Sequence, residues 1–507
     1  MTDFRVAIVG TGFSGIGMAA RLKREGIDDF VVLERNEGVG GTWWDNTYPG
    51  CQCDVPSHLY SFSFAANPSW SRTYSLQPEI RDYLRDCAER FGITPHVRFG
   101  CELRSAAWDE EAACWRLETA DGELTAEALV AGVGPLSEPA TPDIPGLERF
   151  EGALFHSARW DHDHDLAGER VAVIGTGASA IQLVPRIQRE VERLHVFQRT
   201  PPWILPHTDR PVSRLERRIY RRFPALQRLL RAGIYASREW LVLAFAKRRG
   251  LMKLPEALAR RHLRRQVPDP ELRSKLTPSY TIGCKRILLS NDWYPALTAP
   301  NTELVTDGIR EVRERSLVTG SGEEIEVDAI VLGTGFRITD FPAADHLFGR
   351  GGRSLNEVWQ GSPQAYLGTS IAGFPNLFLL LGPNTGLGHN SMVFMIESQI
   401  AHVIRCLRAS EERGAHAIEI RQEAQEAYNA GVQRDLAGSV WNAGGCKSWY
   451  IDRTGRNTTI WPRFTWQFRR SARRFDASAY RFLRRARPAG EDAGDEGAEL
   501  LGRPVAA

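Results

Sequence analysis

The sequence lacks the features that mark several special classes of protein. Its 64 Lys and Arg nearly balance its 62 Asp and Glu, so the formal net charge of +2 gives no overall positive field to attract nucleic acid. The longest apolar run, WLVLAFA at 240–246, is too short to cross a bilayer. An apolar, strand-like run already begins at Phe4, so no secretory signal peptide fits at the start. We therefore expect a cytoplasmic protein without a nucleic acid partner.

The eight cysteines lack the spacing of a metal site or of a disulfide scaffold. Cys51 and Cys53 are separated by one residue, which is too close for a redox-active pair, and disulfide scaffolds belong to much shorter chains. His162 and His164 stand on an expected loop, where they would form a poor chelate. The sequence therefore predicts a reduced protein, and we assign it no metal.

The first residues contain a motif typical of dinucleotide binding. FRVAIVGTGFSGIGMAARLKREG predicts a strand, a tight turn and a helix. Gly10 allows the turn, Gly12 lets the backbone approach a pyrophosphate, and Gly15 lets the helix pack closely on the strand. A second strand ends at Glu34, about 20 residues further on, where a carboxylate can accept a hydrogen bond from a ribose 2′-hydroxyl. This unit predicts a nucleotide such as FAD or NAD.

A second motif of the same kind lies in ERVAVIGTGASAIQLVPRI, residues 169–187. Gly175, Gly177 and Ala180 give the pattern G-x-G-x-x-A between a strand and a helix. The strand that follows ends at Arg199 and Thr200 in place of an acid. A guanidinium binds a 2′-phosphate in a bidentate fashion, whereas a carboxylate would repel it. The second site therefore predicts NADP, with a solvated surface role for Arg199 as the alternative.

Two such sites in one chain are typical of a flavoprotein with two nucleotide cofactors. Disulfide reductases share this layout, but they carry a redox-active cysteine pair near the first flavin helix. The corresponding stretch here, GVGGTWWDNTYPGCQCDVPSHLY, has bulky aromatic residues and only the closely spaced Cys51 and Cys53. A disulfide between cysteines so close would be badly strained. We therefore set the reductase interpretation aside.

Several stretches resemble the class B flavoprotein monooxygenases, and within them the Baeyer–Villiger monooxygenases. The family's linker signature, Phe-x-Gly-x-x-x-His-x-x-x-Trp followed by Pro or Asp, is matched in full. Related N-hydroxylases and flavin-containing monooxygenases have a similar linker but lack its Trp–Asp ending. A second family signature is matched by Gly40, Gly41, Trp43, the Tyr-Pro-Gly at 48–50, and Asp54.

Three further segments are similar to parts of the same family. GCKRILLSNDWYPAL (283–297) is similar to the segment with the family's catalytic arginine. VLGTGF (331–336) and GGCKSWYIDRTGRN (444–457) are similar to its return strand and substrate-side loop. The linker residues are Phe150, Gly152, His156, Trp160 and Asp161.

The resemblance implies an enzyme that uses FAD, NADPH and O₂ to insert one oxygen atom next to a ketone carbonyl, giving an ester or lactone through a C4a-peroxyflavin. A fixed cation keeps such a peroxide deprotonated, and Arg286 suits this role because arginine stays protonated. Asp54 would hold the guanidinium, or would have only a structural role beside the flavin turn. His156 would anchor the linker rather than transfer protons. Lys285 would bind the 2′-phosphate, with a solvated lysine as the alternative. Trp449 would help to exclude water, with core packing as the alternative.

Two other functions stay open at this point. A related monooxygenase could oxygenate nitrogen or sulfur, and a flavoprotein without catalysis could serve redox sensing or partner binding. The sequence names neither the ketone nor the oligomeric state. The motifs and the resemblance together assign to the FAD site Gly10, Gly12, Ser14, Gly15, Glu34, Gly41, Thr42, Trp43, Asp54, Tyr60, Leu103 and Met392, and to the NADP site Gln52, Cys53, Gly175, Thr176, Gly177, Ser179, Ala180, Gln182, Arg199, Thr200, Lys285 and Trp449.

The predicted fold class is α/β, with two Rossmann-like dinucleotide-binding domains and a helical insertion. An Arg-rich stretch within the insertion, 210–266, predicts amphipathic helices, which we expect to cap the domain rather than to contact a membrane. The tail at 488–507 is rich in Ala, Gly and acids and is expected to be disordered. The predicted parts are an FAD domain in two pieces (1–145 and 336–487), a linker (146–164), and an NADP domain (165–335) with the helical insertion at about 205–275.

Overall fold

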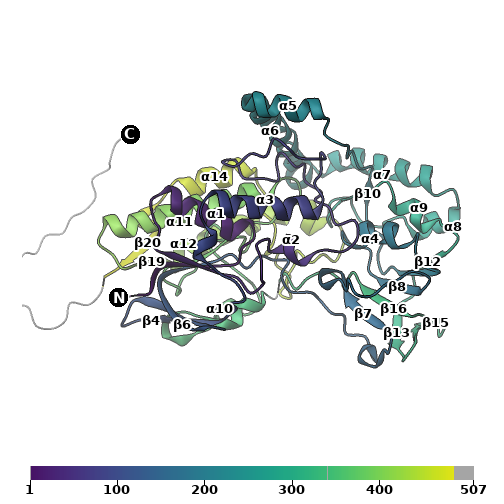
Figure 1. The fold of residues 1–507 in the computed structure, drawn as a ribbon, viewed down its shortest axis with the longest axis horizontal. Coiled ribbons are helices and arrows are strands. Elements are labelled where there is room, and N and C mark those ends of the chain that lie inside the picture. Colours follow the sequence, from purple (N-terminus) through teal and green to yellow (C-terminus); the bar gives the residue numbers. More distant parts are fainter. Residues whose placement is uncertain (1, 340, 485–507) are drawn as a thin grey trace, which may run out of the picture.

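The computed structural model describes residues 2–339 and 341–484, which form two α/β domains side by side (Figure 1). The predicted disordered tail, 488–507, lies outside the described residues. Parallel strands at the centre of each domain are buried on both faces, and their sequences are therefore mostly apolar, as in FRVAIV at β1 (Phe4–Val9), where Arg5 is the one charged residue.

The first domain is built on an eight-stranded sheet in the order β17-β4-β5-β6-β1-β2-β3, with β18 also paired to β6. β1 pairs in parallel with β2 and β6, whereas β4, β5 and β6 form an antiparallel meander. β17 and β18 follow the second domain in the chain, so this sheet contains strands from both of the predicted pieces. The further bounds are β2 (Phe30–Leu33), β3 (Val97–Arg98), β4 (Leu103–Asp109), β5 (Cys114–Thr119), β6 (Gly122–Ala131), β17 (Leu347–Phe348) and β18 (Leu377–Leu379).

Helices from both pieces cover one face of this sheet, where α1, α3, α11 and α14 lie together in Figure 1. α11 contacts both α1 and α14, and most of its residues are therefore buried. The elements are α1 (Phe13–Arg24), α2 (Thr42–Asp45), α3 (Gln77–Arg90), α10 (Leu355–Trp359), α11 (Met392–Glu412), β19 (Ala417–Ile420), α12 (Gln422–Ala437), α13 (Val440–Ala443), α14 (Thr465–Arg473) and β20 (Tyr480–Leu483).

The second domain has a parallel five-stranded sheet in the order β12-β9-β8-β16-β7. Its edge strand β7 comes from the linker signature and pairs along its length with β16. A three-stranded antiparallel sheet, β13-β14-β15, extends the domain at one end. The bounds are β7 (Ala153–His156), β8 (Arg170–Ile174), α4 (Ala180–Ile187), β9 (Arg193–Phe197), β10 (Ile204–Leu205), β11 (Leu288–Leu289), α9 (Trp293–Leu297), β12 (Thr302–Val305), β13 (Ile309–Val312), β14 (Ser316–Thr319), β15 (Glu324–Glu326) and β16 (Ala329–Leu332).

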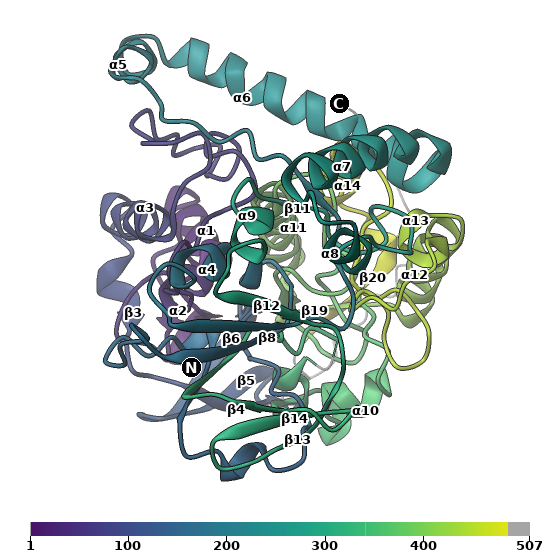
Figure 2. The ribbon, with the colours of Figure 1, turned by 90° about the vertical axis from the view of Figure 1, so that its right-hand side faces the viewer.

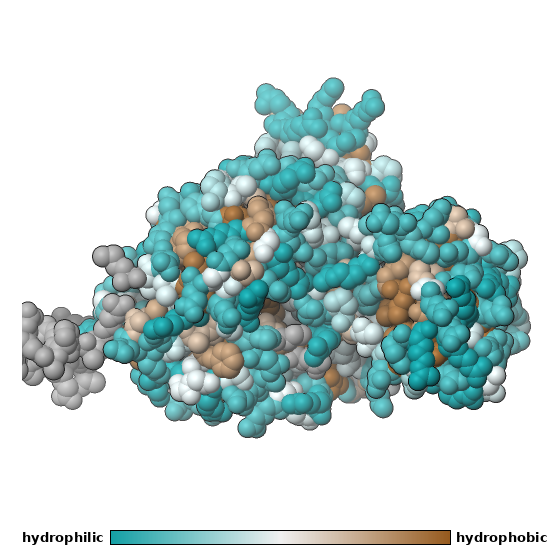
Figure 3. Space-filling view, turned by 60° about the horizontal axis from the view of Figure 1, so that its bottom comes forward, coloured by the Kyte–Doolittle hydropathy of each residue, from teal (hydrophilic) through white to brown (hydrophobic). Residues whose placement is uncertain are grey.

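The predicted helical insertion contains four α-helices, with a π-helical turn (Leu243–Lys247) and a 3-10 turn (Arg249–Met252) between α6 and α7. α5 starts at a capping box, in which the Ser213 hydroxyl and the Glu216 carboxylate each accept a hydrogen bond from the other residue's backbone. α5 and α6 project from the body on the side away from β13 and β14 (Figure 2), and long hydrophilic side chains stand out from this projection in Figure 3. The bounds are α5 (Arg214–Arg222), α6 (Pro224–Glu239), α7 (Lys253–Gln266) and α8 (Pro270–Lys275).

The chain crosses between the domains twice, and the two crossings lie side by side. Ala140 N–H donates to the Gly335 carbonyl at 2.8 Å, and Arg337 N–H donates to the Glu138 carbonyl at 3.0 Å. These two paired segments are the covalent connections between the domains.

One disulfide joins Cys284 to Cys446, with 6.1 Å between their Cα atoms. The expectation of a fully reduced chain is therefore wrong, although no disulfide scaffold is present and the other six cysteines are buried and form no disulfide. Sequence spacing gave no signal for this bond, because the partners lie 162 positions apart and meet only through the packing of the domains. Within 2–339 and 341–484, no helix is long and apolar enough to span a membrane.

Candidate active site

The first glycine-rich turn has a geometry that only glycine permits at two of its positions. Gly10 has φ +92°, and a Cβ there would lie 2.9 Å from the Gly132 carbonyl oxygen. A Cβ at Gly15 would lie 1.8 Å from the Gly10 oxygen. Gly41, from the second signature, faces the same turn, since its Cβ would lie 2.8 Å from the Gly12 Cα. Bare backbone from two loops therefore converges at the start of α1, as binding of a pyrophosphate requires.

Glu34, at the end of β2, is buried and fixed in place. Its carboxylate accepts from Thr11 N–H at 2.8 Å, from the Thr11 hydroxyl at 2.6 Å and from Asn36 N–H at 2.9 Å. A carboxylate has about four acceptor positions, so one remains for a ribose hydroxyl. The residues of the first motif thus fit the adenosine half of FAD.

The remaining predicted FAD residues are placed around this turn and along the same domain. Trp43 donates from Nε1 to the Tyr60 hydroxyl at 3.2 Å, and the two rings meet edge to face. Ser14 is buried in the first turn of α1. Thr42, Leu103 and Met392 are the first residues of α2, β4 and α11.

The second glycine-rich turn repeats the arrangement. Gly175 has φ +116°, and a Cβ there would lie 2.4 Å from the Gly333 oxygen, whereas Gly177 faces open space. Ala180 begins α4 and packs against Gly333. The Thr176 hydroxyl donates to the carbonyl of Thr200, which joins the turn to the end of β9. This turn, too, leaves its middle glycine accessible to a pyrophosphate.

Arg199 and Lys285, predicted separately from two distant segments, act on each other. Burial lowers the pKa of the Lys285 amine, and the Arg199 charge lowers it further. The Lys285 ammonium also lies 5.3 Å from the centre of the Tyr280 ring. Two cations held near one another favour an anion with more than one negative charge, and a 2′-phosphate fits this description.

Gln182 of α4 ties the second domain to the signature loop of the first. Its Oε1 accepts from the Tyr48 hydroxyl at 2.9 Å and from Gln52 N–H at 3.2 Å, and its Nε2 donates to the Gln52 carbonyl at 2.9 Å. Ser179 precedes α4 as its N-cap residue. Cys53 is buried beside this contact, and burial raises the pKa of its thiol. Gln52 and Cys53 thus lie at the junction of the domains.

Arg286 and Asp54 form a bidentate ion pair across the domain junction. Arg286 Nε lies 2.7 Å from one carboxylate oxygen, and a terminal nitrogen lies 2.5 Å from the other. The side chains are 36% and 26% exposed, so the pair is reachable from the junction. The carboxylate raises the pKa of Arg286, although burial opposes this. Burial would raise the pKa of Asp54, but the guanidinium outweighs it and holds that pKa below its usual value. Both groups are therefore charged at neutral pH.

Two residues near this pair belong to no predicted site. Tyr450 is buried, and burial raises the pKa of its hydroxyl to about 12, with Arg286 acting in the opposite direction. Arg238, from α6, also lowers the pKa of Asp54 and donates to the Tyr74 hydroxyl at 3.3 Å. In the sequence, only the neighbouring predicted residue Trp449 pointed to Tyr450 as a site residue. Nothing in the sequence pointed to Arg238. Trp449 packs on Tyr450 but is 45% exposed. The alternative that Trp449 belongs to the core does not agree with this exposure.

The linker signature is explained by packing. A Cβ at Gly152 would lie 2.2 Å from the Asp328 oxygen and 2.7 Å from the Phe150 ring, so this position admits only glycine. His156 is buried against Phe336 of the return crossing, and burial lowers its pKa to about 4. A neutral, enclosed imidazole is suited to anchoring rather than to proton transfer. Trp160 packs edge-on against Phe155, and the Asp161 carboxylate accepts from Asp163 N–H at 3.0 Å.

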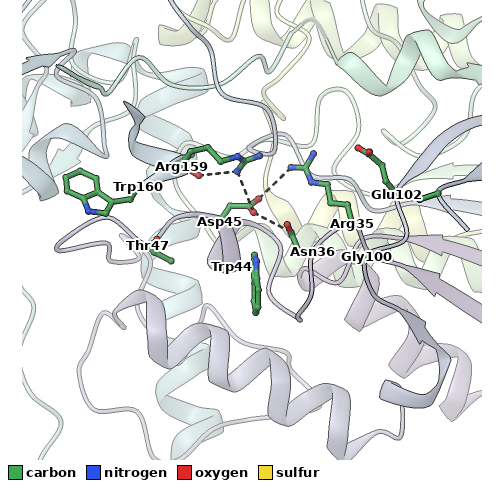
Figure 4. Close-up of a pocket in the computed structure, with 11 residues that line it drawn as sticks. Arg35, Asn36, Trp44, Asp45, Thr47, Gly100, Glu102, Arg159 and Trp160 are labelled. Atoms are coloured by element: carbon green, nitrogen blue, oxygen red, sulfur yellow. Dashed lines mark hydrogen bonds and ion pairs between the residues drawn. The ribbon is translucent and has the colours of Figure 1, made fainter. Parts of the chain in front are cut away.

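A pocket of about 580 Å³ lies between the first domain and the linker (Figure 4). Asp45 lies between Arg35 and Arg159, at 3.8 and 3.6 Å, and Trp160 forms part of the wall. Arg286 and Asp54 are not among its lining residues, so this pocket is separate from the ion pair. Over the described ranges, no group of three or more His, Cys, Asp or Glu is arranged to hold a metal ion.

Comparisons with known proteins agree with this geometry. A family model described as pyridine nucleotide-disulphide oxidoreductase matches residues 7–239. A Baeyer–Villiger monooxygenase of Pseudomonas aeruginosa is 56% identical over 478 residues, which cover 94% of this chain and 91% of that protein. One of Streptomyces coelicolor is 53% identical over 496 residues, covering 98% and 95%. Among solved structures, closed cyclohexanone monooxygenase has a TM-score of 0.84 at 28% identity, covering 95% and 99%. A complex of OTEMO with FAD and NADP has a TM-score of 0.85 at 25% identity, covering 95% and 100%.

Two nucleotide-binding domains with an arginine–carboxylate pair at their junction define a flavin-dependent monooxygenase. The extent of the identity to curated relatives makes the family specific: the chain belongs to the Baeyer–Villiger monooxygenases. It is an enzyme that depends on FAD and NADPH and inserts one oxygen atom of O₂ next to a ketone carbonyl.

Proposed function

We propose that Arg286 is the catalytic cation of this enzyme and that Asp54 positions it. The observation that carries this proposal is the bidentate contact between the two side chains, one from each domain. When bound, FAD and NADPH supply the electrons that activate O₂ for transfer to the substrate. A guanidinium held from behind by a carboxylate keeps its outer face oriented toward developing negative charge, which is the arrangement that electrostatic catalysis requires.

The other predicted residues hold the cofactors and limit water. Arg199 and Lys285 bind the 2′-phosphate of NADPH, and this contact selects NADPH over NADH. Gly10, Gly12 and Gly41 receive the FAD pyrophosphate. Tyr450 lies near the ion pair, and with Trp449, which packs on it, limits the access of water when the cofactors are bound.

The substrate we propose is an uncharged ketone, in keeping with the cyclohexanone monooxygenases that this chain resembles in structure. We place the enzyme in the cytoplasm, where NADPH is regenerated. Oxygenation of nitrogen or sulfur is the second candidate function, because the same activated oxygen can attack other acceptors.

Product analysis tests the proposal. The FAD-loaded enzyme is given NADPH and ¹⁸O₂ together with a cyclic ketone and, in a parallel reaction, a thioether. We expect a lactone that contains one labelled oxygen atom, formed with a kcat/KM above that for sulfoxide. Sulfoxide from the thioether, with no lactone from any ketone of a broad panel, would replace the proposal by the second candidate.

A further inference from the structure

The segment at 210–266 carries a charge that the rest of the chain offsets. It contains 17 Lys or Arg and three Asp or Glu, a formal charge of +14. The other 450 residues contain 47 basic and 59 acidic residues, a formal charge of −12. The near-zero net charge of the whole protein therefore hides one strongly basic region, which extends from the projecting helices α5 and α6 to α7 on the body (Figures 1 and 2).

The three acidic residues of this segment leave most of its exposed basic residues unpaired by acids of the same segment. Glu216 pairs with Arg210 at 2.7 Å, and Glu256 pairs with Arg260 at 2.9 Å. Glu239 is buried and points inward. The exposed basic residues comprise Arg214, Arg218, Arg221, Arg222, Arg228, Lys247, Arg248, Arg249, Lys253, Arg261, Arg264 and Arg265.

The inner face of α6 is fixed to the body by polar contacts at both ends and in the middle. Gln227 donates to the Asn67 carbonyl at 2.7 Å, and Arg231 donates to the His58 carbonyl at 2.7 Å. Glu239 accepts from the Asn390 amide and from the Thr465 hydroxyl, both at 2.7 Å. A helix held in this way presents its outer face in one defined orientation.

That outer face is apolar, although it is exposed. Leu226, Leu229 and Trp240 are 47%, 69% and 67% exposed, and they follow one stripe of the helix together with the small residues at 233 and 236. Phe223, at the start of α6, is 54% exposed. Further along the segment, Leu251, Leu254 and Leu258 are also exposed, Leu254 to 80%. Exposed leucine and tryptophan side chains gathered in this way are typical of a binding surface.

We propose that this surface, the basic–apolar surface formed by α5, α6 and α7, binds peripherally to a bilayer that contains anionic lipids. Leu, Phe and Trp side chains enter the headgroup boundary while the surrounding Arg and Lys contact lipid phosphates, which is how interfacial helices bind. A second copy of the chain is a poor occupant, because two segments with a formal charge of +14 each would repel one another. Nucleic acid would use the charge but would leave the leucines and Trp240 exposed to water.

Vesicle co-sedimentation of the FAD-loaded enzyme tests the proposal. We expect binding to vesicles of phosphatidylcholine with one quarter phosphatidylglycerol, no binding to pure phosphatidylcholine, and weaker binding as salt rises. Leu229→Ser with Trp240→Ser removes apolar contact, and Arg221→Gln, Arg222→Gln and Arg228→Gln remove charge. Each set should lower vesicle binding by about tenfold or more, while ketone turnover per bound flavin stays unchanged.

A matched control removes three exposed arginines from other surfaces: Arg104→Gln, Arg315→Gln and Arg353→Gln should leave vesicle binding unchanged. Equal binding to neutral and anionic vesicles, or no binding to either at low salt, would overturn the proposal. It would also be overturned if the double variant at Leu229 and Trp240 abolished a dimer seen by analytical ultracentrifugation. Retention of vesicle binding by both sets of variants would equally assign the lipid contact to another surface.

Discussion

Arg286 and Asp54 meet in a bidentate ion pair although 232 positions separate them in the chain. Arg286 comes from the second domain and Asp54 from the signature loop of the first. The pair exists only when the two domains are in contact, so the proposed catalytic cation is assembled by the domain arrangement.

Removal of Arg286 should block oxygen transfer more than any other step. Loss of a preorganised charge costs roughly 3 to 4 kcal/mol, or about 10²- to 10³-fold in rate. Arg286→Lys should rescue only in part, because an ammonium lacks the planar fork that Asp54 holds. Ketone turnover per bound flavin in Arg286→Ala is the measurement. Arg186→Ala, which removes an exposed arginine of the same domain, serves as the control. Ester formation at the wild-type rate by well-folded Arg286→Ala would contradict the assignment.

The contribution of Asp54 to stability should disappear in acid. The pKa of Asp54 in the folded protein lies below its ordinary value of 3.8, so the unfolded chain binds a proton first as the pH falls. The stability gained from the ion pair is therefore fully present well above pH 3.8 and is lost as the pH falls through the lower, folded value. The difference in unfolding free energy between the wild type and Asp54→Asn, measured with urea, should stay constant down to about pH 5 and then shrink. A difference that grows with acid would be inconsistent with a lowered pKa.

Arg199 and Lys285 should together decide the choice of reductant. Loss of a charge-assisted phosphate contact costs about 1.5 to 3 kcal/mol, so Arg199→Ala should raise the KM for NADPH by roughly ten- to a hundredfold and leave NADH little changed. Lys285→Ala should act in the same direction, and the double variant should fall short of the sum because both cations hold one group. Arg193→Ala, at the start of β9, is the control. An unchanged NADPH/NADH ratio in Arg199→Ala would remove this residue from the site.

The Cys284–Cys446 bond should keep the C-terminal loop over the ion pair. Cys284 precedes Lys285 and Arg286, and Cys446 lies three positions before Trp449. Cys446→Ser should lower stability by about 2 to 4 kcal/mol and should raise the hydrogen peroxide formed per NADPH, because water gains access to the site. Thermal unfolding and a peroxide assay measure these effects. Cys101→Ser, at a free buried cysteine, should leave peroxide formation unchanged. If Cys446→Ser formed one ester per NADPH oxidised, without extra hydrogen peroxide, the bond would have no part in excluding water from the site.

The glycine-rich turns were determined by the sequence alone. Gly10 and Gly175 adopt a positive φ that the turn itself imposes, and a Cβ at Gly15 would clash with Gly10 of the same turn, so these requirements are local in the chain. The fold class followed from these units, since each specifies a strand, a turn and a helix of one known type. The linker signature is local only in part: Gly152 packs on Phe150, but it is also enclosed by the distant Asp328 carbonyl.

Only the tertiary structure decided which of these segments meet. The proximity of Lys285 to Arg199, the positions of Tyr450 and Arg238 beside the ion pair, and the Cys284–Cys446 bond all depend on how two separate sheets pack. The expectation of a reduced chain failed for this reason: cysteine spacing reports on near neighbours, whereas this bond spans 162 positions. The apolar stripe of α6 was present in the sequence as an amphipathic pattern, but an amphipathic pattern does not say which face is covered. Packing of the face with Gln227, Arg231 and Tyr235 against the body left the leucines and Trp240 exposed.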